Sequence, residues 1–162
     1  MTRLSALIIV AVQTSLVACG GGEAVQGPAP PPPPPPPPDL SFQSIAGEWA
    51  GWATEGGDVW FWVRAQLGSS ARRGDQVGTV EYGLGSPQNE PECGGGWFAS
   101  SAEDPVFVVL ERITFGGTCP DGTVRLVLDV ETGILDYEFT PDGGFADATG
   151  ALTRGTDPGP QP

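Results

Sequence analysis

The chain of 162 residues contains no histidine and no lysine, and arginine supplies all seven of its basic residues. Without histidine, Ser-His and Cys-His nucleophilic sites and histidine-ligated zinc or haem are excluded. Without lysine, Schiff-base chemistry and a P-loop lysine are excluded as well. Twenty acidic residues bring the net charge to -13 at pH 7, so phosphate backbones would repel the protein. We therefore expect no nucleic-acid partner.

Long apolar runs are scarce too, and the one near the N-terminus predicts a signal peptide at residues 1–18. Arg3 provides a short positive segment, and Leu4–Val17 provide the apolar segment that follows it. This run is too short to be predicted as a membrane span. Cleavage near residue 18 would make this an exported protein.

The stretch LVAC at residues 16–19 resembles the lipobox of bacterial lipoproteins, in which the peptide is cut before a cysteine that then receives diacylglycerol. The resemblance implies that Cys19 anchors the protein in the bacterial envelope. Gly20 follows this cysteine where inner-membrane lipoproteins carry Asp, so the resemblance further implies the outer membrane. The alternative is an ordinary signal peptide with an incidental cysteine.

Residues 19–41 are rich in glycine and proline and have almost no apolar content, so we expect a disordered tether here. Pro30–Pro38 favour polyproline II, which would make a semi-rigid spacer of roughly 28 Å. Residues 42–155 are predicted to form the only folded domain, and residues 156–162 a disordered tail.

Period-two alternation and frequent glycine, proline and Asp-Gly turns predict an all-β domain. The predicted strands are Gly47–Thr54, Asp58–Leu67, Gln76–Gly83, Cys93–Ser100, Pro105–Phe115, Gly122–Val130, Ile134–Thr140 and Phe145–Arg154. Short connections favour an antiparallel meander, and closure of eight strands into a barrel removes exposed edges. A two-sheet sandwich would need longer crossovers.

The alternation also predicts which side chains face the barrel interior. Inward positions are Val124, Leu126, Leu128 and Val130 in one strand and Leu135, Tyr137 and Phe139 in the next, whereas Arg125 and Asp129 face outward. The strand over residues 105–115 is apolar on both faces, so we expect the tether or a partner to cover its outer face.

Cys93 and Cys119 remain after Cys19 is assigned, and an even pair in an exported protein predicts a disulfide. The pair encloses about 26 residues, for which the chain-entropy model gives roughly 3 to 4 kcal/mol of stabilisation. Two cysteines without histidine are too few for a zinc site, and a redox pair would prefer a shorter spacing.

Four of the five tryptophans lie within one short stretch, which makes them candidate binding residues. Three alternatives are open: an exposed aromatic patch for a glycan or protein partner, an aromatic ligand pocket, or a purely structural role. The candidate residues are Trp49, Trp52, Trp60, Trp62 and Arg64.

Carboxylates are the only abundant reactive groups, so an enzyme would have to use a glycosidase-like pair. Glu48, Glu55 and Asp58 are expected to cluster near the first hairpin. Glu111 lies on an apolar face, where its pKa would be raised unless it pairs with Arg64 or Arg112. A solvated acidic face is the commoner outcome, so we expect no catalytic residues, no metal and no cofactor.

The sequence Gly47-Glu48-Trp49 at the start of an eight-stranded meander resembles the calycin barrels, lipocalins and avidins. The resemblance implies an arginine stacked over the tryptophan, a position that Arg154 could fill. The stretches at residues 93–97, 110–113 and 119–122 are also similar to extracellular domains of unknown function on bacterial lipoproteins and membrane kinases.

Together these patterns predict a lipid-anchored envelope module for binding or interaction, without enzymatic activity. Two alternatives stay open. One is a calycin-like carrier of a small apolar ligand, and the other is an inhibitor or structural partner of another envelope protein.

Overall fold

A computed structural model describes residues 30–36 and 38–162 of the chain, and the barrel unit comprises Pro36–Pro162. The predicted signal peptide and Cys19 lie outside the described residues. Residues 30–36 have no regular secondary structure. In the described part of the chain, no helix is long and apolar enough to cross a bilayer.

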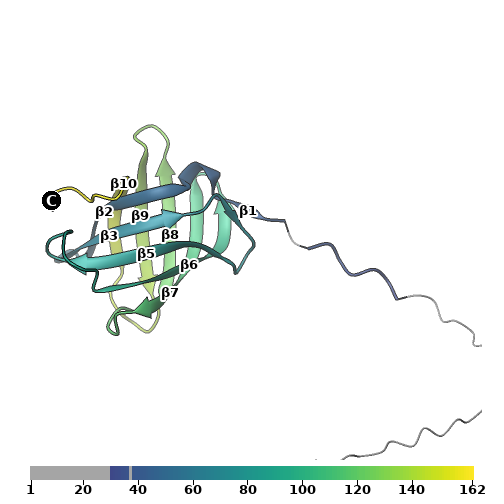
Figure 1. Ribbon diagram of the computed structural model, residues 1–162, viewed down its shortest axis with the longest axis horizontal. Coiled ribbons are helices and arrows are strands. Elements are labelled where there is room, and N and C mark those ends of the chain that lie inside the picture. The colour runs from purple at the N-terminus through teal and green to yellow at the C-terminus, as the bar shows by residue number, and fades with distance from the viewer. Residues whose placement is uncertain (1–29, 37) are drawn as a thin grey trace, which may run out of the picture. The chain divides into compact units, whose positions relative to one another are not determined.

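Eight antiparallel strands close into a barrel in the order β10-β2-β3-β5-β6-β7-β8-β9, as Figure 1 shows. The elements are β1 (Leu40–Ser41), the short helix η1 (Gln43–Ile45), β2 (Gly47–Glu55), β3 (Val59–Leu67), β4 (Ser70–Ala71), β5 (Gln76–Leu84), β6 (Cys93–Glu103), β7 (Val106–Phe115), β8 (Gly122–Asp129), β9 (Ile134–Pro141) and β10 (Ala148–Arg154). β10 pairs with β2, so the barrel has no free edge. The predicted all-β meander barrel is therefore confirmed.

The predicted alternation of inward and outward side chains also holds over most of the barrel wall. Val124 and Leu126 of β8 and Leu135 and Tyr137 of β9 are buried in the core. Val130 is the exception: it is 78% exposed because β8 ends one residue before it, where the chain turns. Arg125 faces outward as expected and forms an ion pair with Glu138.

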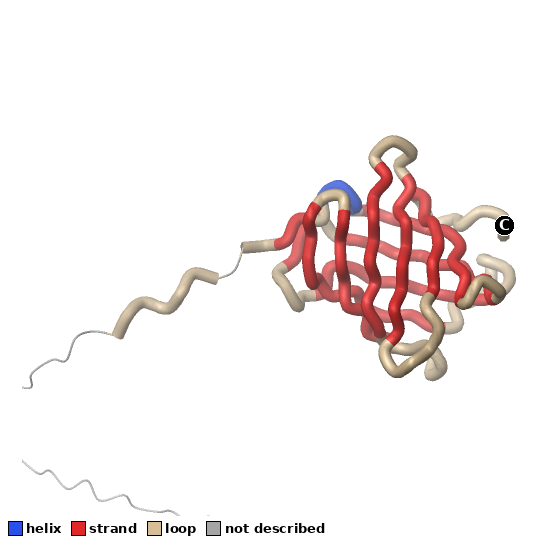
Figure 2. The backbone as a smooth tube through the Cα atoms, turned by 180° about the vertical axis from the view of Figure 1, so that it is seen from behind, coloured by secondary structure: helices blue, strands red, loops and turns tan. Residues whose placement is uncertain are grey.

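One end of the barrel is closed by the segment that precedes β2. Phe42 and Ile45 are fully buried, and the Phe42 ring packs against Phe107 at 5.7 Å between centroids. β1 pairs with β4 at this end, and η1 lies beside it, as Figure 2 shows. No strand or helix was predicted before Gly47, because β1 and η1 are too short to carry a periodic pattern.

Trp49 and Arg154 stabilise this closed end through hydrogen bonds and a cation–π contact. The Trp49 indole donates to the carbonyl of Ile45 at 2.7 Å, and the Arg154 guanidinium lies 4.5 Å from the Trp49 ring centroid. Arg154 also donates to the carbonyls of Ala46 and Ser44. The expected stacking of Arg154 over the tryptophan is thus confirmed.

The C-terminal residues, which we expected to be disordered, run along the outer face of β2 and β3. The Trp52 indole donates to the carbonyl of Gly159 at 3.1 Å, and Arg64 Nε donates to the carbonyl of Thr156 at 2.8 Å. Arg64 in turn lies 4.8 Å from the centroid of the Trp62 ring. The tail therefore covers an aromatic surface that the barrel wall leaves open.

Candidate functional site

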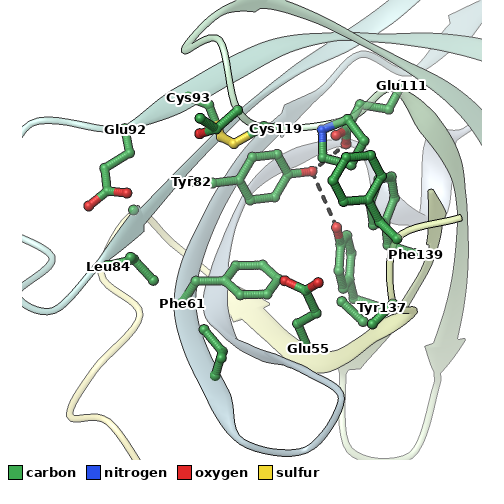
Figure 3. A pocket seen from close by; sticks show the side chains of 17 residues that line it. Glu55, Phe61, Tyr82, Leu84, Glu92, Cys93, Glu111, Cys119, Tyr137 and Phe139 are labelled. Atoms are coloured by element: carbon green, nitrogen blue, oxygen red, sulfur yellow. Dashed lines mark hydrogen bonds between the residues drawn. A yellow bond between two sulfur atoms is a disulfide. The ribbon is translucent and has the colours of Figure 1, made fainter. Parts of the chain in front are cut away.

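A cavity of about 340 Å³ opens at the end of the barrel opposite the short helix (Figure 3). This is the end at which the β2–β3, β5–β6, β7–β8 and β9–β10 connections lie. Five aromatic side chains line the cavity, and they are Phe61, Tyr82, Tyr137, Phe139 and Phe145. The volume lies at the small end of the range of roughly 300–1,000 Å³ typical of small-molecule sites.

The rim of the cavity is unusually apolar for a protein surface. Val59, Leu84 and Phe145 line it, and they are 50%, 46% and 56% exposed. They account for three of the five large hydrophobic residues that are exposed in the described part of the chain. Apolar side chains that gather around a concave opening are a mark of a binding site rather than of ordinary surface.

The disulfide between Cys93 and Cys119 lies at the same rim, and both cysteines line the cavity. It joins the start of β6 to the connection between β7 and β8, with 6.4 Å between the Cα atoms. The predicted disulfide is therefore confirmed. It holds one of the connections at the mouth against the barrel wall.

The base of the cavity carries a buried carboxylate, Glu111, which is 1% exposed. Its Oε2 accepts hydrogen bonds from the hydroxyl of Tyr82 and, at 2.7 Å, from the indole of Trp97. The Tyr82 and Tyr137 hydroxyl oxygens are 3.3 Å apart, and Figure 3 shows both rings inside the barrel. Glu111 is the only charged residue buried in the described core.

Burial dominates the electrostatics of this cluster. Loss of solvent raises the pKa of Glu111 from 4.5 to about 7; the hydrogen bonds from Tyr82 and Trp97 oppose this rise, and the nearby charge of Asp121 adds to it. Burial likewise raises the pKa of Tyr82 and of Tyr137 above the ordinary value. Glu111 therefore changes protonation near neutral pH while both tyrosines stay protonated.

Strand register brings these groups together. Trp97 of β6 lies directly opposite Glu111, and Gly122 of β8 lies opposite it on the other side. A Cβ atom on Gly122 would lie 2.4 Å from Cε2 of Phe139, so glycine at this position leaves room for the Phe139 ring. The sequence thus places one carboxylate among aromatic side chains, with a glycine beside it in place of a larger residue.

The alternation of β7 predicted that Glu111 would lie on an apolar face, and its burial in the core confirms this. Neither candidate arginine is its partner. Arg112 points outward to Asp121 and Asp142, at 3.4 Å from each carboxylate. Tyr82 and Trp97 were not predicted as partners of Glu111, because the contact depends on register across β5, β6 and β7.

The predicted cluster of Glu48, Glu55 and Asp58 does not form. Glu48 and Glu55 stand at opposite ends of β2, which at about 3.3 Å per residue separates them by roughly 23 Å. Of the three, only Glu55 lines the cavity. Closeness in the sequence was misleading here because an extended strand carries neighbours far apart.

None of the candidate residues Trp49, Trp52, Trp60, Trp62 and Arg64 lines the cavity. Trp49 belongs to the closed end, and the other four face outward from β2 and β3. Trp62 has no exposed surface, so it is not part of an open aromatic patch. Its ring lies over Gly83, where a Cβ atom would come within 2.3 Å of it. Trp60 is partly exposed beside the C-terminal prolines.

Comparison with protein-family models, with curated proteins and with solved structures finds no match for this chain. The site must therefore be interpreted from its own chemistry.

The cavity offers aromatic faces, hydrogen-bond acceptors and negative charge. Glu55, Glu92 and Glu111 line it, and no arginine does. Across residues 30–36 and 38–162, no three acidic or cysteine side chains gather closely enough to hold a metal ion. The arrangement is a mostly apolar cavity, open at one end of the barrel, with one buried polar cluster at its base.

Proposed function

We propose that the barrel binds a small, mostly apolar molecule in the cavity at its open end and that it acts as a carrier or receptor rather than as an enzyme. The observation that supports this most directly is the cavity itself, with an apolar rim and a single hydrogen-bonded cluster around Glu111 at its base. A few convergent polar groups in an otherwise apolar cavity fix the orientation of a ligand. A calycin-like carrier of a small apolar ligand was the first of the two alternatives drawn from the sequence, and this cavity is the site that we propose for it.

The closed end supports a relation to the calycin barrels, which we propose as the structural class. The support comes from the N-terminal segment that fills one end of the barrel and from Arg154 stacked on Trp49. An eight-stranded barrel leaves an interior wide enough for one small ligand when part of it is not filled by side chains. Here Phe42 and Ile45, which together form a plug, fill one end, and the other end is left for a ligand.

We further propose that Cys19 anchors the protein to a bacterial membrane, as the LVAC stretch suggests, with the outer membrane as the expected location. The support is the sequence alone. Replacing Cys19 with alanine should release the protein from the membrane fraction of the cells that make it. Unchanged retention in that fraction would argue against the anchor.

The binding function can be tested by native mass spectrometry on protein purified under non-denaturing conditions from the cells that make it. We expect a reproducible additional small-molecule mass. The variant Ala146→Trp places a large ring in the mouth loop and should lose this mass. Ala151→Trp, the matched change on the outer face of β10, should keep it.

If both variants kept the additional small-molecule mass equally, the ligand would be bound outside the cavity. Absence of a bound mass from the wild-type protein, together with failure to bind any of the compounds described below, would contradict the binding function.

A further inference from the structure

We propose that the cavity selects an organic cation, namely a compact amine that carries its charge next to an aromatic or short apolar body. This inference rests on the proposed binding function and specifies its ligand class. The carboxylates of Glu55, Glu92 and Glu111 line the cavity together with five aromatic rings and no basic side chain. An anionic ligand, such as a fatty acid, would find no positive partner here.

The direction of the hydrogen bonds at the base of the cavity determines which groups a ligand there must supply. The Tyr82 hydroxyl donates its single proton to Glu111 Oε2, so the hydrogen bond between the two tyrosines uses the proton of Tyr137. The Trp97 indole proton also goes to Oε2. These donors are all engaged within the protein, and both bonds to Glu111 are made to one carboxylate oxygen. The base of the cavity therefore offers acceptors, and a ligand must supply the donors.

The aromatic walls of the cavity also favour a positively charged ligand. The rings of Phe61 and Tyr82 meet edge to face at 5.9 Å between centroids, and Figure 3 shows them around the cavity together with Tyr137, Phe139 and Glu111. The faces of aromatic rings carry partial negative charge and attract ammonium groups, most strongly where water is excluded. The walls and the base thus favour the same sign of ligand charge.

The mouth of the cavity is lined by acidic side chains as well. Glu55 and Glu92 add negative charge there, and the whole chain carries a net charge of -13. A cleft lined by one sign of charge between low-dielectric walls raises the local concentration of oppositely charged ligands. Entry of a cation is therefore favoured as well as its binding.

Three compounds of nearly equal size test the inference: 2-phenylethylammonium, 2-phenylethanol and 3-phenylpropanoate. Binding is followed by NMR through the indole N–H signal of Trp97, which is hydrogen-bonded to Glu111 and is assigned with the variant Trp97→Phe. At about pH 8, where Glu111 is ionised, we expect the ammonium compound to bind at least about tenfold more tightly than the alcohol. The carboxylate should bind most weakly.

The role of Glu111 is tested with Glu111→Gln, which keeps the side-chain shape and removes the charge. We expect this variant to bind the ammonium compound about tenfold more weakly and the alcohol almost unchanged. Glu81→Gln removes the same charge from the exposed face of β5 and should change neither affinity. Loss of the ammonium preference in the control variant as well would assign the preference to general charge and not to Glu111.

A measurement on the wild-type protein provides a check that does not depend on the folding of a variant. Affinity for the ammonium compound should rise between about pH 5.5 and pH 8, because alkylammonium groups stay charged there while Glu111 ionises. The groups that face or lie near Glu111 are Tyr82, Tyr137 and Asp121, with Glu55 and Glu92 at the mouth. Affinity for the alcohol should not follow this rise.

The outcomes separate the two proposals. If the alcohol or the carboxylate binds as tightly as the ammonium compound, the cavity is a binding site and the inference about charge is wrong. If none of the three shifts the Trp97 signal at millimolar concentration, the inference about charge is wrong, and absence of a bound mass from the wild-type protein as well would contradict the binding function.

Discussion

Burial of Glu111 makes a quantitative prediction about stability. Its pKa is raised from 4.5 to about 7, which at 1.36 kcal/mol per pKa unit corresponds to about 3 kcal/mol. Below about pH 4.5 the carboxyl is protonated in both the folded and the unfolded chain, and the protein has the full stability that this group allows. Between about pH 4.5 and pH 7 the unfolded chain releases the proton while the folded chain keeps it. The free energy of unfolding should therefore fall as the pH rises through this window, and it should level off above pH 7.

The assay is urea unfolding, followed by tryptophan fluorescence, of the wild type and of Glu111→Gln across this pH range. Other carboxylates also titrate, so the informative quantity is the difference between the two proteins. We expect the wild type to lose about 3 kcal/mol relative to the variant between about pH 4.5 and pH 8. In thermal unfolding the same loss should amount to roughly 12 °C, at roughly 4 °C per kcal/mol for a domain of this size.

Glu81→Gln is the control, because it removes an exposed carboxylate from the outer face of β5, a strand that does not pair with β7. Its difference from the wild type should stay nearly constant with pH. A constant difference for Glu111→Gln as well would refute the reasoning, because it would mean that Glu111 titrates alike in the folded and unfolded chains.

Two further predictions concern the two ends of the barrel. Replacing both Cys93 and Cys119 with alanine should lower the free energy of unfolding by about 3 to 4 kcal/mol, measured by urea unfolding without reductant. Reductant should not destabilise this variant further. If reductant lowered its free energy of unfolding by the same amount, the disulfide would not be the cause of the loss. Arg154→Gln should lower it by about 1 to 3 kcal/mol through lost stacking and two lost hydrogen bonds. The exposed ion-paired Arg125 serves as its control, since Arg125→Gln should cost less than about 1 kcal/mol; equal losses in the two variants would contradict the role of Arg154 in closing the barrel.

The strands and their inward faces could be predicted because each depends on a local, period-two pattern. The eight barrel strands have the predicted order, and Leu135 and Tyr137 face the interior as the alternation indicated. Glu111 was found in the same way, from its place in the alternating residues of β7. Information of this kind is present within a single strand.

The remainder depends on contacts between distant segments. The hydrogen bonds of Glu111 to Tyr82 and Trp97 require the correct register of β6 against its neighbours, including two register shifts between β6 and β7. The plug of Phe42 and Ile45 consists of short elements whose conformation is stabilised by burial rather than by local pattern. The cavity is what remains unfilled after all of these side chains have packed, so no single stretch of sequence indicates it.

The chain enters the barrel unit at the closed end, through β1 and η1, and the mouth lies at the other end. A mechanical pull on the N-terminal side of the unit would be borne first by the two-residue pairing of β1 with β4 and by the buried Phe42 and Ile45. The connections around the cavity would carry this load only after the plug had been extracted. Tension along the chain would therefore loosen the plug while the mouth of the cavity kept its shape.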